Sequence, residues 1–128
     1  MVTRFFPWIA SVCLLGAALP TLAHHSFANE YDESTPVTLE GVVTRIDWEN
    51  PHVRYYVDVT QPDGTVVNWS CETSGPKRLE SRGWMRDTLK PGDKVVVHAF
   101  VSKDGQHYAD GRKVTLSDGR TISSVPKN

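Results

Sequence analysis

The chain has 128 residues, a formal net charge of −1 and 39% hydrophobic residues, which is the size and composition of one globular domain and excludes wholesale disorder. The near balance of charge argues against a dedicated nucleic-acid-binding protein, because such proteins carry a basic surplus. Two cysteines are too few for a disulfide-rich scaffold.

Residues 1–23 have the layout of a cleavable signal peptide. An early arginine is followed by a nearly continuous apolar stretch over residues 5–19, and the small residue Ala23 precedes the expected cleavage site. The stretch is shorter than the roughly 18–20 residues that a membrane-spanning helix needs. Lipidation at Cys13 is the alternative, but this cysteine lies within the apolar stretch. We expect a periplasmic or secreted protein whose mature chain begins at His24 and has no membrane span.

The mature chain is predicted to start with an extended arm over residues 24–36, followed by a single domain over residues 37–128. Between residues 37 and 48, apolar side chains alternate with polar ones, which indicates a long first strand. The alternation changes phase at Gly41, after which Val42 continues the apolar face. A glycine at a phase change predicts a β-bulge that lets the strand bend.

Two further strands are predicted to follow as a hairpin. Residues 53–59 alternate in a half-buried pattern, Pro62-Asp63-Gly64 supplies the turn, and residues 67–71 form a third strand. Cys71 lies on the same face as Trp69, so we expect a buried and chemically inert thiol. The alternation along the strands assigns the following residues to the core: Val53, Tyr55, Val57, Val67, Trp69, Val95 and Val97.

A short helix is expected to interrupt the strands. Ser74 is placed to cap it, Pro76–Arg82 form it, and Gly83 suits the position just beyond its end. Residues 94–101 then form a strong β run, and two shorter strands follow. This element order is that of an OB-fold, a Greek-key barrel with its helix between strands 3 and 4. We therefore predict an all-β, five- to six-stranded OB-fold-like barrel, with an open β-sandwich as the alternative.

Several short motifs stand out in the mature chain. Four of them are His24-His25-Ser26-Phe27, Trp48-Glu49-Asn50-Pro51-His52, Arg82-Gly83-Trp84 and Leu89-Lys90-Pro91-Gly92-Asp93. In combination they resemble a family of small exported bacterial proteins, the domain of unknown function numbered 6152. The resemblance covers nearly all of the mature chain. It implies an exported single domain, and it implies no activity, cofactor or site residue.

The histidine pair at the expected mature N-terminus is the strongest candidate for chemistry. After cleavage, the α-amine and imidazole of His24 can chelate one metal ion, and His25 adds a second imidazole. Such nitrogen ligands suit Cu(II) best among the divalent ions. His52 is the best third ligand, because it follows the rigid Asn50-Pro51 turn and its parity directs it away from the core. The spacing of these histidines is not a diagnostic metal motif, so an incidental role stays open.

The outer face of the second strand is a separate candidate site. Arg54 and Tyr56 share this face by parity, and OB-folds often bind oligosaccharides or oligonucleotides across strands 2 and 3. The slightly acidic charge argues against nucleic acid. A small organic ligand or an exported protein partner is therefore expected there. The chain has no nucleophile elbow, P-loop or dinucleotide-binding glycine motif, so we expect no catalytic residues.

Together these features predict an exported, non-enzymatic binding module. Its sharpest form binds copper or another transition metal through His24, His25 and His52. The alternative is a module without a metal that uses Arg54 and Tyr56 to bind an organic ligand or a protein, including an exported enzyme to which it is an accessory subunit.

Overall fold

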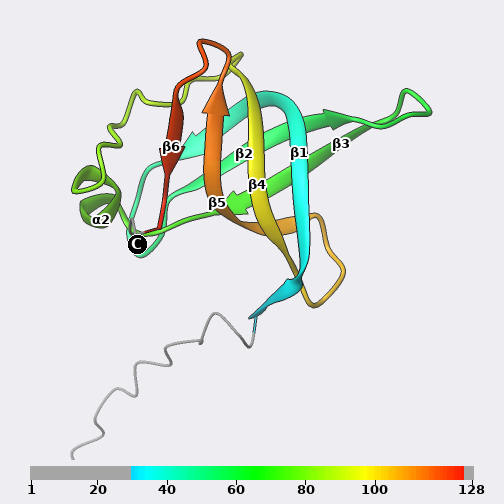
Figure 1. The fold of residues 1–128 in the computed structure, drawn as a ribbon, viewed down its shortest axis with the longest axis horizontal. Helices are drawn as coiled ribbons and strands as arrows, with labels where there is room; N and C mark the ends of the chain where they lie inside the picture. Colours follow the sequence, from blue (N-terminus) through cyan, green and yellow to red (C-terminus); the bar gives the residue numbers. More distant parts are fainter. Residues whose placement is uncertain (1–29, 126–128) are drawn as a thin grey trace, which may run out of the picture.

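The computed structural model describes residues 30–125, which form a small β-rich domain (Figure 1). Its elements are β1 (Tyr31–Asp47), β2 (Arg54–Thr60), β3 (Val66–Glu72), α2 (Pro76–Glu80), β4 (Lys94–Ser102), β5 (Tyr108–Leu116) and β6 (Thr121–Ser123). The predicted signal peptide, its cleavage site and the start of the predicted arm lie outside the described residues. No helix within residues 30–125 is long and apolar enough to cross a membrane.

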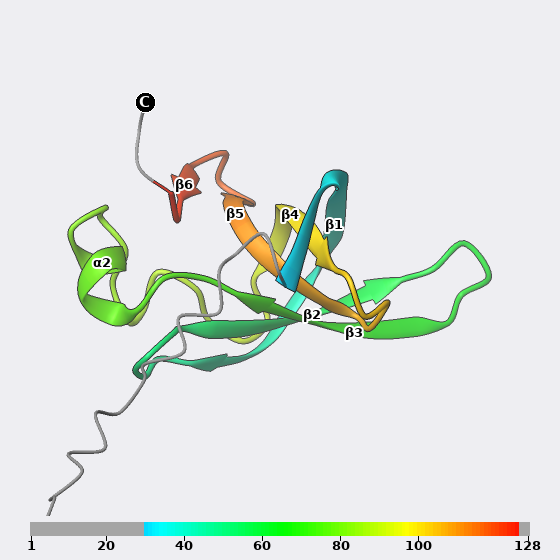
Figure 2. The ribbon, with the colours of Figure 1, turned by 90° about the horizontal axis from the view of Figure 1, so that it is seen from below.

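The strands form one sheet that closes on itself. Its order is β3-β2-β1-β4-β5-β6 with antiparallel neighbours, and a parallel pairing of β3 with β5 completes the ring. With α2 between β3 and β4, this topology confirms the predicted all-β, OB-fold-like barrel over the open sandwich. Figures 1 and 2 show the β2–β3 hairpin extending from one side of the barrel and α2 lying on the opposite side.

The ring of strands encloses a single apolar core. Its buried members are Leu39, Val43, Val53, Tyr55, Val57, Cys71, Leu79, Trp84, Leu89, Val95, Val97, Ala99, Ala109, Val114 and Leu116. Most of the predicted core is therefore confirmed, including the buried thiol of Cys71. Val67 and Trp69 are only half-buried, because the β2–β3 hairpin continues past the barrel and leaves part of its inner face uncovered.

Strand β1 differs from its prediction in two respects. It begins at Tyr31, so residues 31–36 of the predicted arm belong to the strand, which is paired with β4 at both ends of that stretch. The phase change also lies elsewhere: the register with β2 shifts just after Val43 and not at Gly41. Val43 is consequently buried, and Val42 faces outward with 37% of its surface exposed.

Gly41 allows the backbones of β1 and β2 to approach closely and does not form a bulge. A Cβ atom at this position would lie 2.2 Å from the carbonyl oxygen of Asp58 and 2.8 Å from Cγ1 of Val57. Strand β1 changes its main partner from β4 to β2 around this point, and only glycine lets the two strands approach so closely.

Helix α2 is shorter than predicted and begins at a different cap. Its N-cap is Gly75, and no side chain caps it, because the hydroxyl of Ser74 accepts a hydrogen bond from Arg82 instead. Gly83 has a φ of 89°, as expected just beyond a helix. This turn directs Trp84 into the core, where its indole N–H donates to the carbonyl oxygen of Ser123 at 3.0 Å.

Candidate functional site

The loop between β1 and β2 presents His52 at its end. The next residue, Val53, is buried and anchors the loop: its N–H donates to the carbonyl oxygen of Ser74, and its own carbonyl oxygen accepts from the N–H of Thr73 at 2.9 Å. The side chain of His52 is half exposed, at 51%. A rigid backbone anchor therefore holds an accessible imidazole at the edge of the barrel.

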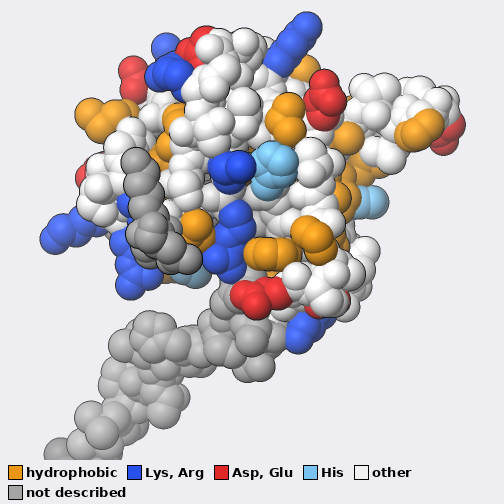
Figure 3. All heavy atoms as spheres, viewed as in Figure 1, with side chains coloured by type: hydrophobic (Ala, Val, Ile, Leu, Met, Phe, Trp, Pro, Cys, Tyr) orange, Lys and Arg blue, Asp and Glu red, His pale blue; other side chains and the backbone are white. Residues whose placement is uncertain are grey.

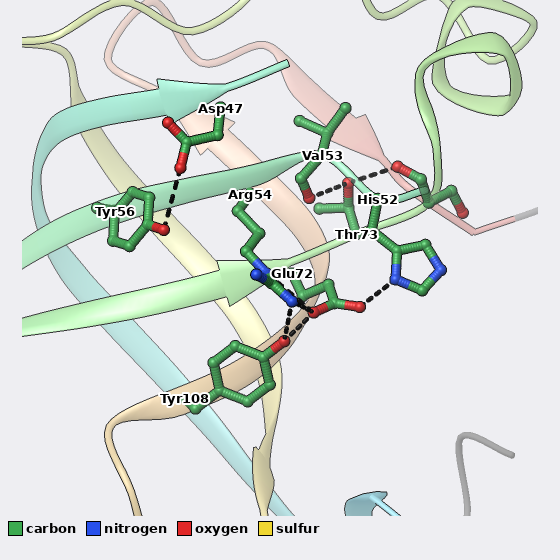
Figure 4. A network of polar contacts seen from close by, with 9 residues as sticks. Asp47, His52, Val53, Arg54, Tyr56, Glu72, Thr73 and Tyr108 are labelled. Carbon is green, nitrogen blue, oxygen red and sulfur yellow. Dashed lines mark hydrogen bonds and ion pairs between the residues drawn. The ribbon is translucent and has the colours of Figure 1, made fainter. Parts of the chain in front are cut away.

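Glu72, the last residue of β3, is the centre of the polar cluster around His52 (Figure 4). Its carboxylate is buried and accepts hydrogen bonds from the Nδ1 atom of His52, the guanidinium of Arg54 and the hydroxyl of Tyr108. The two Arg54 contacts measure 3.1 Å from Nε and 2.8 Å from Nη2. We call Glu72 and these three partners the Glu72 cluster.

The Glu72 cluster determines which ring nitrogen of His52 is available to a ligand. A carboxylate already paired with the Arg54 guanidinium accepts hydrogen bonds, so the proton of the His52 ring lies on Nδ1, which contacts Glu72. In a neutral ring the remaining nitrogen, Nε2, then carries the lone pair, and Figure 4 shows this nitrogen on the side of the ring away from Glu72. This arrangement is the one in which protein carboxylates orient histidine ligands toward metal ions.

The beginning of β1 adjoins the same cluster. The ring of Tyr31 stacks on the ring of Tyr108, with centroids 5.8 Å apart and planes inclined by 20°. Burial and the nearby charge of Glu72 raise the pKa of the Tyr31 hydroxyl, so this group remains protonated. The chain that leads back toward His24 and His25 thus enters the described structure beside the Glu72 cluster.

The predicted pair Arg54 and Tyr56 lies on the outer sheet face, but each belongs to a different group of contacts. Arg54 is engaged by the Glu72 cluster. The Tyr56 hydroxyl donates to Asp47 at 3.1 Å, and the guanidinium of Arg45 lies 4.0 Å above the Tyr56 ring while bonding Asp47 at 3.0 Å. The structure therefore divides this face into two neighbouring polar groups.

The other described histidines lie away from this cluster. Nδ1 of His98 is 3.3 Å from the hydroxyl of Thr38, and His107 packs edge-on against Trp69. Within residues 30–125, no group of three or more His, Cys, Asp or Glu side chains is arranged to hold a metal ion. The predicted ligands His24 and His25 lie outside the described residues. In Figure 3, acidic and basic side chains are scattered over the visible face.

Sequence reasoning missed Glu72 and Tyr108. The first could have been found, because the turn at residues 62–64 sets a hairpin register that puts Glu72 directly opposite Arg54. Tyr108 joins the cluster only through the parallel pairing of β3 with β5, in which it lies opposite Ser70. No local pattern encodes that pairing.

The comparison with protein families gives one result. A family of unknown function (DUF6152) matches residues 12–111. The chain belongs to this family. Every residue of the Glu72 cluster lies within the DUF6152 match. No curated protein and no solved structure matches the chain.

Proposed function

We propose that this DUF6152 protein is an exported, non-enzymatic binding module for a transition-metal ion, with Cu(II) as the preferred ion. His52 is one ligand through Nε2, and His24 and His25 of the mature N-terminus supply the others. The observation that supports this proposal is the contact of His52 Nδ1 with the buried carboxylate of Glu72, which leaves Nε2 as the accessible nitrogen.

The N-terminal histidines are close enough in sequence to reach His52. The chain advances six residues from His25 to Tyr31 and can span up to about 20 Å when extended. From Tyr31 to His52 the path crosses one ring stack of 5.8 Å and two hydrogen-bonding contacts, through Tyr108 and Glu72. The start of β1 therefore lies beside the cluster that contains His52.

The three histidines form a suitable donor set for copper. A free amine at His24 and its own imidazole close a chelate ring, and imidazole nitrogens favour Cu(II) over the other common divalent ions. In this proposal the role of the three histidines is to bind the ion. No reaction is assigned to it.

Removal of the free amine tests the proposal directly. We expect a chain that begins at His24 to bind one equivalent of Cu(II), and the same chain with an added N-terminal Gly-Ser to bind it at least tenfold more weakly, as measured by competition titration. The extension displaces the amine from the His24 imidazole and leaves residues 30–125 unchanged. Equal affinity of the two forms would contradict the proposal.

The contribution of His52 has its own control. His52→Ala should weaken Cu(II) binding by less than the Gly-Ser extension does, because it removes one ligand and leaves the chelate. His98→Ala should leave the affinity unchanged, because this histidine contacts Thr38 away from the cluster. If both substitutions had the same effect, the copper would be bound by scattered imidazoles.

Glu72 is a positioning residue in this proposal. Glu72→Gln should weaken Cu(II) binding by about tenfold, the lower end of the usual effect of losing a carboxylate behind a histidine ligand. Asp47→Asn is the matched control, because Asp47 is a carboxylate on the same sheet face that bonds Tyr56 and Arg45 and not His52. An electron paramagnetic resonance spectrum that changes with Glu72→Gln but not with Asp47→Asn would separate a positioning role from a loss of fold.

Binding of a flat organic ligand on the outer sheet face is the second candidate. The observation that favours it is the planar guanidinium of Arg45, which lies 4.0 Å above the Tyr56 ring and shows that this ring can stack with a flat group. A flat ligand would bind there by displacing Arg45. In that case Tyr56→Ala should abolish ligand binding in a carbohydrate screen, and the Gly-Ser extension should have no effect.

A further inference from the structure

One edge of the sheet lacks a partner strand within the described part of the chain. Strand β3 pairs with β2 along its whole length, from Val66 to Glu72, but with β5 only from Ser70 to Glu72. Residues 66–69 are therefore an open edge among residues 30–125. They belong to the hairpin that extends beyond the barrel in Figures 1 and 2, and Val66 and Asn68 are exposed.

The direction of the free backbone groups follows from two hydrogen bonds. The carbonyl oxygen of Thr65 accepts from Gln61 across the hairpin at 2.7 Å, whereas the N–H of Ser70 donates away from β2, to His107, at 3.0 Å. Because hydrogen-bonding direction alternates along an antiparallel strand, the N–H and C=O groups of Val66 and Asn68 point the same way as Ser70. Within residues 30–125, no strand lies opposite these four groups.

The edge also lacks the charges, prolines and bulges that commonly prevent strand pairing. Residues 65–71 contain no charged residue and no proline, and the register between β2 and β3 has no bulge. Natural edge strands are normally protected by charges, prolines or bulges. Val66 is 58% exposed, and Val67 is only half-buried.

We propose that two copies of this chain pair antiparallel through the open edge of β3, about a two-fold axis at Val67. In this register Val66 lies opposite the partner's Asn68, and Asn68 lies opposite the partner's Val66. The pairing forms four backbone hydrogen bonds and satisfies all four free groups. Val67 faces the partner's Val67 across the axis, which makes an apolar contact on the inner face of the hairpin.

The register is restricted by Ser70. Any shift toward the end of β3 would require the N–H of Ser70, which already donates to His107. A two-fold pairing is also self-complementary, so one short edge leaves no unpaired group on either copy. Because the contact is small, we expect a dimer whose population rises with protein concentration.

Site-specific crosslinking tests the register. In this pairing the Cβ atoms of Val67 and the partner's Val67 are about 4.5–5.5 Å apart, near the range of a disulfide, whereas those of Val66 and the partner's Val66 are about 7–8 Å apart. Val67→Cys should therefore give a covalent dimer under mild oxidation, and Val66→Cys should give several-fold less. Cys71 is buried and common to both variants. Equal crosslinking of the two variants, or none in either, would overturn the proposal.

Sedimentation equilibrium gives an independent readout. The unmodified chain should show a mass that rises with concentration. Val67→Lys should remain a monomer at every concentration, because two lysines would face each other at the axis. Val66→Lys is the matched control and should still associate, because its opposite residue is the partner's Asn68. A monomeric unmodified chain, including one that instead binds an added extended peptide, would refute pairing between copies.

Discussion

Among the individual residues, Glu72 is a carboxylate that is buried and needs hydrogen-bonding partners in place of water. A buried carboxylate loses its hydration, which costs several kcal/mol unless charged and hydrogen-bonding partners replace the water. Arg54, Tyr108 and His52 provide these partners. The imidazole of His52 is therefore oriented by the need to satisfy a buried charge, even though half of its own surface is exposed. The contact with Glu72 thus holds the His52 imidazole in this orientation before any ligand binds.

Cys71 is expected to be inert in the folded protein. Burial raises the pKa of its thiol to about 12, so almost no nucleophilic thiolate is present near neutral pH. The predicted removal of residues 1–23 would leave it as the only thiol in the chain. We expect it not to react with a thiol reagent at pH 8, and to react fully in denaturant. Rapid labelling of the folded protein would contradict this burial.

The same shift has a consequence for stability at high pH. The pKa of the thiol lies near 9.0 in the unfolded chain and near 12 in the folded one, so the folded state retains the proton more strongly. The contribution of Cys71 is thus constant below about pH 9, and the free energy of unfolding falls as the pH rises from 9 toward 12. Cys71→Ala should reduce this slope in urea titrations at several pH values.

Among the elements, β1 determines how the barrel closes. It pairs with β4 from Tyr31 to Val42 and with β2 from Val42 to Asp47, so one strand belongs to both sides of the barrel. The change of partner falls where Gly41 leaves room for the backbone of β2. Strand β3 differs from β1. It pairs with both β2 and β5 at its end, from Ser70 to Glu72, and with β2 alone at its start, from Val66 to Trp69.

Gly41→Ala should destabilise the barrel. The added Cβ would meet the backbone oxygen of Asp58 at 2.2 Å, and backbone cannot turn aside as a flexible side chain can. We expect the free energy of unfolding to fall by about 1–3 kcal/mol, as for other overpacked sites. Glu40→Ala, an exposed change next to it, should alter stability by less than about 0.5 kcal/mol in the same urea denaturation experiment.

In the whole molecule, ring closure brings distant parts of the chain to one place. The parallel pairing of β3 with β5 puts Tyr108 beside Glu72, and the pairing of β1 with β4 puts Tyr31 beside Tyr108. The proposed metal site depends on this convergence, because it joins the N-terminal histidines to the β1–β2 loop. The proposal also depends on the predicted export and cleavage after Ala23, which would create the free amine of His24.

Processing is a prediction for the whole chain. Intact-mass analysis of the protein purified from the exporting cells should give a chain that begins at His24, because Ala23 follows the apolar stretch. A product that retains Met1, or that starts after Phe27, would remove the amine ligand and with it the proposed chelate. The fold of residues 30–125 would not be affected by that result.

Several features of the fold were predictable from local patterns. Strict alternation in β2 and β4 identified Val53, Tyr55, Val57, Val95 and Val97 as core residues, because side chains of a strand alternate between its two faces. The turn at residues 62–64 and the glycine after the helix also acted as local signals, since each suits a backbone geometry that few residues adopt. The order of these elements was sufficient to predict the barrel.

Tertiary structure alone decided the phase of β1 and the composition of the site. Gly41 reads as a bulge in sequence, but its role is set by contact with Asp58, a residue on another strand. Trp69 alternates like a core residue but is only partly buried, because the hairpin extends beyond the barrel that would cover it. The Glu72 cluster and the open edge of β3 both depend on the pairing of β3 with β5. The cluster forms where the two strands pair, and the edge is open where that pairing ends. By itself the sequence determined the period and order of the elements, which depend on near neighbours; the tertiary structure decided which distant side chains meet, because that depends on how the sheet closes.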